Sequence, residues 1–176
     1  MSAALSGAVL AGVLSAFLMI GRTGYAAGSY SEMDAQLRRA LEAFGADARK
    51  AVDVRWHGAQ LLTLHVASAG AAATPVTYGY DSVSTSPTYR SFYRLRGEPD
   101  STEPRLPLLH NVAPDFAFAR FKLEQPGVPD NTATNDLETK QLEVSLRAGR
   151  SGATATGASQ SAVSARYILR NKRVTN

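Results

Sequence analysis

Three histidines are the residues of this chain best suited to acid–base or zinc chemistry. His57, His65 and His110 do not form the H-x-x-H or H-E-x-x-H spacing of a helical zinc site. We therefore interpret them as surface histidines. The sequence has no cysteine, which excludes disulfides, thiolate metal sites and cysteine nucleophiles.

An oxygen-rich segment offers a second kind of chemistry. Asp130, Asn131, Asn135 and Asp136 carry the carboxylate and amide oxygens that calcium prefers. Their spacing does not match an EF-hand loop, and Asn and Asp also favour turns. The sequence therefore predicts turns here and no metal, with a calcium loop as the weaker alternative.

No spacing of nucleophiles or phosphate-binding residues indicates an enzyme. No serine lies in a G-x-S-x-G elbow, and the glycines around Arg150 lack the lysine of a P-loop. We expect no catalytic residue, no cofactor and no small-molecule substrate.

The charge of the chain is mildly basic. The formal net charge is +4 and the isoelectric point about 9.6. The densest basic cluster is Arg166, Arg170, Lys172 and Arg173, and the other basic residues are scattered. A nucleic-acid surface needs a concentrated basic patch. We interpret the cluster as a solvated or partner-facing strand end and do not expect nucleic acid as a partner.

The first residues form a run without charge. Residues 2–21 contain no Asp, Glu, Lys or Arg, and a membrane-spanning helix needs about 20 such residues. Small residues recur every four positions, which favours close helix–helix packing beside larger apolar residues. The predicted membrane and helix-packing residues are Ala4, Leu5, Ala8, Val9, Gly12, Val13, Ala16 and Phe17. We expect residues 1–28 to be the transmembrane or filament-core half of a helix.

A cleaved secretory signal is the alternative for this run. No Lys or Arg precedes it, and the small residues near Ala26 form a poor cleavage site. An uncleaved anchor is favoured. Arg22, Arg38 and Arg39 all follow the run, so the positive-inside rule alone would keep the following domain in the cytoplasm.

The next segment has the period of an amphipathic helix. Apolar residues recur at spacings of three or four over residues 29–52, with charged residues between them. The predicted helix–sheet core is Met33, Leu37, Leu41, Phe44, Ala48 and Trp56. If residues 2–52 formed one helix, it would be about 75 Å long.

The period then changes to that of strands. Val54 and Trp56 alternate with polar residues, as do Leu62 and Leu64 in the following run. Further strands are expected near residues 76–80, 91–95, 106–112, 116–121, 142–146 and 163–169, with Pro107 at a sheet edge. Loops are expected at residues 67–74, 125–136 and 149–160. The fold class is therefore α+β, a long N-terminal helix packed on a mainly antiparallel β-sheet domain of residues 53–176.

This order of parts resembles the type IV pilin and type II secretion pseudopilin superfamily. The segment QLRRALEAFGADARKAVDVRW is most similar to the J-type minor pseudopilins. In that group a helix with the pattern R-x-x-L-x-x-x-x-x-D-x-R-x-A leads into the first strand. Arg38, Leu41, Asp47, Arg49 and Ala51 occupy those places. The family's basic leader and F-T-L-x-E-like start do not occur in the sequence, so prepilin processing is assigned to no residue.

The resemblance implies a function in assembly. It implies a minor pilin or pseudopilin that contacts other subunits through its N-terminal helix, and membrane lipid before assembly. It also implies single-pass insertion in the inner membrane, with the C-terminal domain in the periplasm or outside the cell. Two alternatives stay open: a generic membrane-tethered envelope binding module, and a DNA-binding pilin-like protein of an uptake system.

Overall fold

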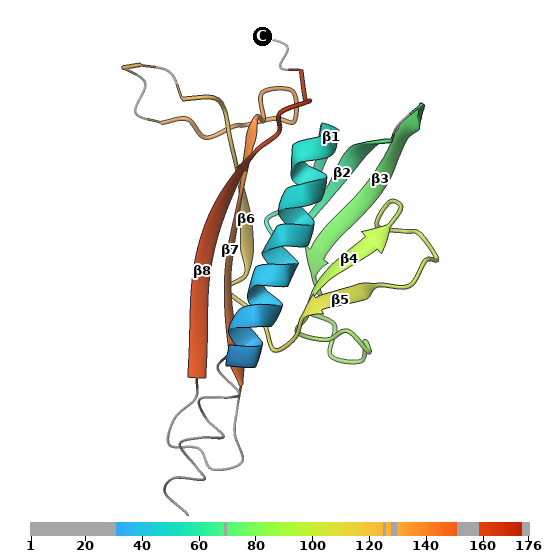
Figure 1. Cartoon of the computed structure of the whole chain (residues 1–176), viewed down its shortest axis with the longest axis vertical. Coiled ribbons are helices and arrows are strands. Elements are labelled where there is room, and N and C mark those ends of the chain that lie inside the picture. Colours follow the sequence, from blue (N-terminus) through green and yellow to red (C-terminus); the bar gives the residue numbers. More distant parts are fainter. Residues whose placement is uncertain (1–30, 69, 125, 128–129, 151–158, 174–176) are drawn as a thin grey trace, which may run out of the picture.

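The fold is known from a computed structural model that describes residues 31–68, 70–124, 126–127, 130–150 and 159–173. Within these residues, a helix of residues 31–50 is followed by eight strands (Figure 1). The strands are β1 (Ala51–Gly58), β2 (Leu61–Ser68), β3 (Ala71–Tyr80), β4 (Phe92–Arg96), β5 (Leu106–Leu109), β6 (Ala117–Phe121), β7 (Gln141–Arg150) and β8 (Ser159–Ile168).

The strands form two antiparallel sheets. The five-stranded sheet has the order β1-β2-β3-β4-β5, and the three-stranded sheet has the order β6-β7-β8. Within each sheet, every strand therefore pairs with the strand next to it in sequence, which is the common arrangement for antiparallel strands. The two sheets meet where the Phe118 N–H donates to the Ala59 carbonyl at 2.6 Å.

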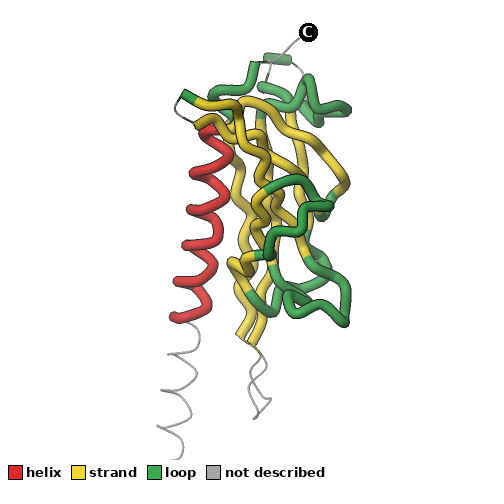
Figure 2. The backbone as a smooth tube through the Cα atoms, turned by 90° about the vertical axis from the view of Figure 1, so that its right-hand side faces the viewer, coloured by secondary structure: helices red, strands yellow, loops and turns green. Residues whose placement is uncertain are grey.

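The helix lies lengthwise against the sheets. Figure 2 shows it on one side of the strands, roughly along their length. Its apolar residues fall on one stripe because they recur every three or four positions. Residues of this stripe, of both sheets and of the loops beside them form a single core. The largest fully buried side chains of that core are Tyr78, Phe44, Phe92 and Phe116.

The predicted fold class, with its long N-terminal helix, is wrong. The described helix covers residues 31–50, about 30 Å, and the two sheets dominate the described structure. It is amphipathic and not apolar, because Arg38, Arg39 and Glu42 lie on the face opposite its apolar stripe. Residues 1–28, with the predicted packing residues Ala4, Leu5, Ala8, Val9, Gly12, Val13, Ala16 and Phe17, lie outside the described residues.

The predicted inner-membrane, single-pass location is also corrected. Over the part of the chain that the structure describes, no helix has the length and apolar character needed to cross a bilayer. The helix of residues 31–50 fails this test because charged side chains recur on every turn, and each is costly in hydrocarbon.

The connection between β2 and β3 differs from the predicted loop of residues 67–74. β2 continues to Ser68 and β3 begins at Ala71, so the hairpin is long and its turn is tight. Gly70 has a φ of 72°, which a residue with a Cβ rarely adopts. The small residues before Thr74 carry little strand propensity, and pairing with β2 decides their structure instead. Pro107 lies in β5, an edge strand, as expected.

Candidate functional site

The helix is held by an aromatic cluster that draws on both sheets. The Phe44 ring lies 5.0 Å from the Tyr78 ring and 6.4 Å from the Phe92 ring, both in the five-stranded sheet. On the other side it lies 5.7 Å from the Phe118 ring and 5.3 Å from the Tyr167 ring. Edge-to-face pairs of this kind add about 0.5–1.5 kcal/mol beyond area burial. Phe44 therefore joins the helix to both sheets at one point.

A polar network fixes the helix one turn further on. The Tyr78 hydroxyl donates to Asp47 Oδ2 at 2.7 Å, and Arg94 Nε donates to the same oxygen at 2.9 Å. Burial raises the pKa of Tyr78 well above its usual range, and the charge of Asp47 adds to this effect. The pKa of Arg94 is also raised: burial is the largest single effect and lowers it, but the hydrogen bonds and electrostatic interactions with Asp47 and Tyr78 together outweigh burial. The tyrosine therefore stays neutral and the arginine charged.

A close approach joins the helix to β8. A Cβ placed on Gly45 would lie 2.5 Å from Cε1 of Tyr167, so only glycine fits there without a shift. The Tyr167 hydroxyl also donates to the Leu41 carbonyl at 3.1 Å. Burial raises the pKa of Tyr167, so the donated proton is retained at neutral pH.

The residues predicted for the helix–sheet core lie together in the structure. Met33, Leu37, Phe44 and Ala48 are buried, and Leu41 and Trp56 are partly buried and pack against the same core. Of the residues that carry the pseudopilin resemblance, Ala51 is fully buried where β1 begins, and Asp47 lies in the polar network.

The opposite side of the helix is a charged surface. Its exposed residues, here called the charged helix face, are Arg38, Arg39, Glu42, Arg49 and Lys50. Arg38 pairs with Asp34 one turn earlier, with Nε at 2.9 Å from Oδ2. Exposed pairs of this kind contribute less than about 1 kcal/mol. This face therefore adds little to the stability of the fold.

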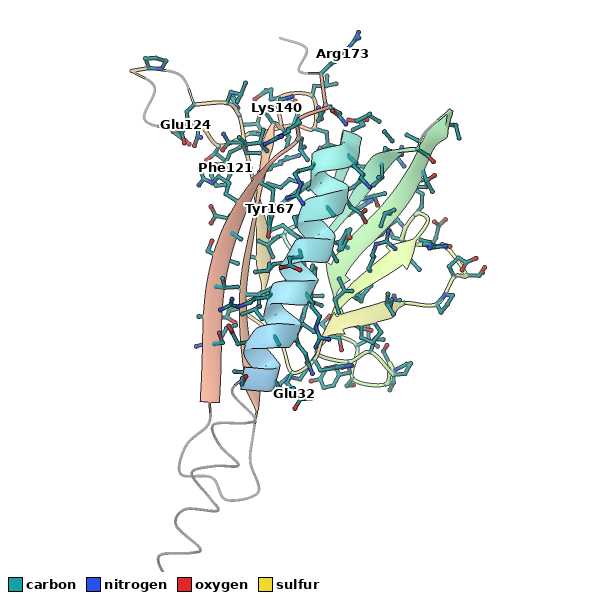
Figure 3. All side chains as sticks on the ribbon, in the orientation of Figure 1. Glu32, Phe121, Glu124, Lys140, Tyr167 and Arg173 are labelled. Atoms are coloured by element: carbon teal, nitrogen blue, oxygen red, sulfur yellow. The ribbon has the colours of Figure 1, made fainter. Side chains whose placement is uncertain are left out.

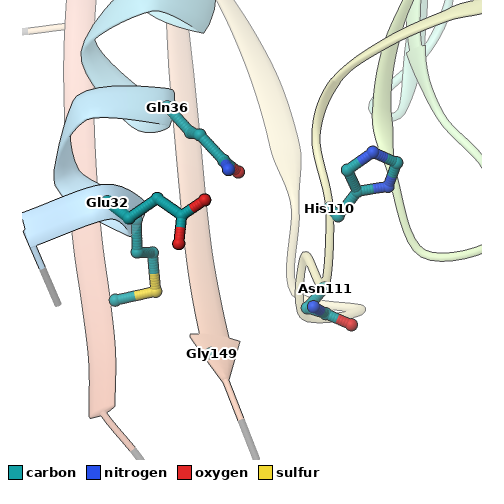
Figure 4. Close-up of a pocket in the computed structure, with 6 residues that line it drawn as sticks. Glu32, Gln36, His110, Asn111 and Gly149 are labelled. Carbon is teal, nitrogen blue, oxygen red and sulfur yellow. The ribbon is translucent and has the colours of Figure 1, made fainter. Parts of the chain in front are cut away.

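A cleft of about 290 Å³ lies at the first turns of the helix (Figure 4). Glu32 and Gln36 extend from the helix toward His110 and Asn111, which follow β5. His110 Nδ1 lies 3.2 Å from the Ser91 hydroxyl. The residues that line the cleft supply one carboxylate, one imidazole and two amides, and no nucleophile paired with a base. This set can donate and accept hydrogen bonds.

A buried carboxylate, Asp81, lies in the loop between β3 and β4 and was not among the residues predicted from the sequence. Asp81 accepts from the Ser86 and Thr88 hydroxyls at 2.5 and 2.6 Å and from the Val83 N–H at 3.0 Å. Arg105 reaches the same group at 2.8 Å. Burial raises the pKa of Asp81, but these hydrogen bonds and the arginine outweigh it, and the net pKa is lowered. The spacing D-x-V-x-x-S-x-T is the only local signal, since Arg105 is distant in sequence.

The predicted oxygen-rich segment is a set of turns tied to the sheets. Asp136 accepts from the Trp56 N–H at 3.1 Å and from Arg120 at 2.7 Å. Asp130 accepts from the Thr132 N–H at 2.9 Å, and the Asn135 side chain accepts from the Glu138 N–H at 3.0 Å. Within the described residues, no three His, Cys, Asp or Glu side chains lie close enough to hold a metal ion.

The predicted basic cluster divides into separate environments. Arg166 pairs with Glu143, while the Lys172 ammonium is buried and donates to the Leu137 carbonyl at 3.2 Å. The Lys140 ammonium donates to the Lys172 carbonyl, and Figure 3 shows Lys140 and Arg173 at the same end of the molecule. Burial lowers the pKa of Lys140, and the charge of Lys172 adds to this. Arg166 and Lys172 are thus held by groups of the protein itself.

The remaining histidines lie together on the outer side of the five-stranded sheet. His57 Nε2 lies 3.0 Å from the Thr63 hydroxyl, and His65 Nε2 lies 3.8 Å from Glu98. Glu98 also accepts from Arg55 at 3.2 Å. These contacts join the loop after β4 to β1 and β2.

Comparison with known proteins gives no family to which this chain can be assigned. No protein-family model matches the sequence, and no curated protein matches it at a significant level.

Proposed function

We propose that this chain is a structural subunit of a filament of the type IV pilin or type II secretion pseudopilin class. In this proposal it acts by assembly and not by catalysis. The charged helix face contacts neighbouring subunits, and the β domain carries the surfaces that meet other partners.

The observation that carries the proposal is how the helix is joined to the sheets. Phe44 contacts both sheets through four aromatic rings, and the Asp47–Arg94 ion pair at 2.9 Å fixes the next turn. A helix fixed in this way transmits force between its own neighbours and the domain as one rigid piece. Rigid attachment is what a filament subunit needs, because its helix and its domain must keep one geometry throughout the assembly.

The position of the pseudopilin-like residues supports the same proposal. Asp47 and Ala51 lie at the end of the helix and the start of β1, where both are enclosed by the protein. Arg38 and Arg49 lie on the charged helix face. In this proposal Asp47 and Ala51 fix the helix to the domain, Leu41 packs against the same core, and Arg38 and Arg49 are exposed for contact with other chains.

Cysteine cross-linking in cells that produce the protein tests this proposal. The chain has no cysteine, so Arg38→Cys and Arg49→Cys each introduce a single thiol on the charged helix face. Thr102→Cys places the matched control thiol in the exposed loop between β4 and β5. We expect a heterobifunctional reagent, which reacts with the introduced thiol at one end and with an amine at the other, to join the two helix variants to a pilin-class subunit in sheared filaments.

The control separates assembly from random collision. We expect the Thr102→Cys variant to give adducts at the background level of the cysteine-free chain. If the helix variants also give only that background, or if their adducts hold no pilin-class subunit, the proposal fails.

A further inference from the structure

The described sheet edges differ in how they are protected against pairing with other chains. Natural edges are blocked by short strands, proline, lysine, bulges or a covering segment. β5 has four residues, contains Pro107 and has a register shift against β4. On the edge of β1, Asp136 accepts from the Trp56 N–H, and the adjoining Ala59 carbonyl accepts from Phe118. Both edges of the five-stranded sheet are therefore blocked.

β8 lacks these forms of protection. It has 10 residues, pairs with β7 along its whole length without a register shift, and contains neither proline nor lysine. It is the last strand of its sheet, and no described backbone group pairs with its outer edge. Figure 1 shows β8 at the margin of the molecule, with the helix toward its inner side. In an antiparallel edge strand, every second residue directs its N–H and C=O outward.

The one charge on β8 does not protect the edge either. Arg166 donates from Nε and Nη2 to Glu143 Oε2 at 3.0 and 2.9 Å. Its guanidinium also lies 3.9 Å from the centre of the Phe121 ring. The side chain is therefore directed across β7 and β6, away from the open edge, and its charge is neutralised within its own sheet.

We propose that β8 pairs with β8 of a second copy of this chain, antiparallel and about a two-fold axis at Ser164. The two three-stranded sheets then become one six-stranded sheet. The interface is isologous, as in most soluble homodimers. The main-chain hydrogen bonds supply affinity, as they do where an extended strand is added to a sheet edge.

The side chains of β8 suit this register. With Ser164 opposite its own copy, Val163 lies opposite Ala165, and Ala162 lies opposite Arg166. Each pair shares one face because side chains alternate along a strand. Val163 and Ala165 are half-buried on the helix side, whereas Ala162 and Ser164 are exposed on the other side. Pairing thus covers small apolar groups on one face and places no like charges opposite each other.

A second copy is a better occupant than a charged or proline-rich segment of another protein. The open edge is neutral, so it offers no electrostatic basis for choosing a charged partner. About Ser164 the central pairs are Ser164 with its own copy and Val163 with Ala165, so a second copy meets the middle of the edge with no bulky or charged side chain at the axis.

The test measures the oligomeric state of the full-length protein and of two lysine variants. Ser164→Lys places like charges together on the two-fold axis, and the substituted side chain is exposed in the monomer. Thr102→Lys makes the same change of charge in the loop between β4 and β5. We expect sedimentation of the unmodified protein to show a monomer–dimer equilibrium. Ser164→Lys should raise the dissociation constant at least tenfold, since like charges in an interface are strongly unfavourable, and Thr102→Lys should leave it unchanged.

A disulfide measurement locates the axis independently. Oxidised Ser164→Cys protein should form a covalent dimer, and Thr102→Cys should not. A protein that stays monomeric at all concentrations overturns the proposal. The β8 edge would then be available for pairing with a strand of a different protein. A dimer that Ser164→Lys does not weaken also overturns it, because another surface must then form the interface. Circular dichroism of each variant shows that a lost dimer is not a lost fold.

Discussion

Replacing Gly45 with alanine tests whether the helix touches β8 as closely as the structure indicates. In an ordinary helix interior, Gly→Ala stabilises the protein by about 1 kcal/mol. Here the added Cβ lies 2.5 Å from Cε1 and 3.0 Å from Cδ1 of Tyr167, well inside contact distance. The half-buried ring must move, and it then loses its hydrogen bond to the Leu41 carbonyl.

The higher helix propensity of alanine stabilises the protein, whereas its clash with the Tyr167 ring destabilises it, and the two effects can be measured separately. Overpacking costs about 1–3 kcal/mol, so the helix-propensity gain leaves a net destabilisation of up to about 2 kcal/mol in Gly45→Ala. In a Tyr167→Ala background the obstacle is gone, and the same substitution should stabilise by about 1 kcal/mol. The coupling free energy between positions 45 and 167, which is the difference between the effects of Gly45→Ala with and without Tyr167, is therefore about 1–3 kcal/mol.

Urea unfolding followed by circular dichroism measures all four proteins of this cycle. Ala35→Gly is the matched control, because it makes the reverse change at an exposed position of the same helix. It should cost about 1 kcal/mol with or without Tyr167. If Gly45→Ala stabilises the unmodified protein as much as it stabilises the Tyr167→Ala variant, the close contact between helix and β8 does not exist.

Three further predictions concern stability. Phe44→Ala should lower the unfolding free energy by about 3–5 kcal/mol, and Phe44→Leu by clearly less, in the same urea assay. Asp47→Ala should cost about 1–3 kcal/mol, because it removes the charged acceptor that Arg94 and the Tyr78 hydroxyl share and leaves them only the longer hydrogen bonds to the Tyr78 oxygen and the Ala43 carbonyl. Equal stability in a melting experiment would refute the polar network. The pKa of Asp81 is lowered on folding, so its stabilisation is present above the ordinary value of 3.8 and is lost as pH falls through the folded value. The stability difference from Asp81→Asn should therefore shrink below that pH; a constant difference would contradict this.

Local periodicity predicted the elements that depend on local pattern. The stripe from Met33 to Ala48 indicated the helix because its buried face repeats every three or four residues. Val54 and Leu64 indicated the β1–β2 hairpin in the same way, through alternation. Pro107 indicated an edge strand because it has no N–H to donate.

Other features depend on contacts between distant residues. Asp81 and Arg105 are joined only in the folded chain, and the division of the strands into two sheets is not visible in any single strand. The long helix was predicted by joining an apolar run to an amphipathic run, but the described helix is limited to residues 31–50. The sequence of β8 alternates like that of the other amphipathic strands, so it did not indicate that β8 would be an unpaired edge strand.

The composition of purified filaments tests the proposed function most directly. We predict that peptides from residues 31–173 will be detected by mass spectrometry in filaments sheared from cells that produce this chain, together with pilin-class subunits. Loss of those filaments should remove the chain from the sheared fraction. If the chain is abundant in the cells but absent from their filaments, its proposed role as a filament subunit is wrong.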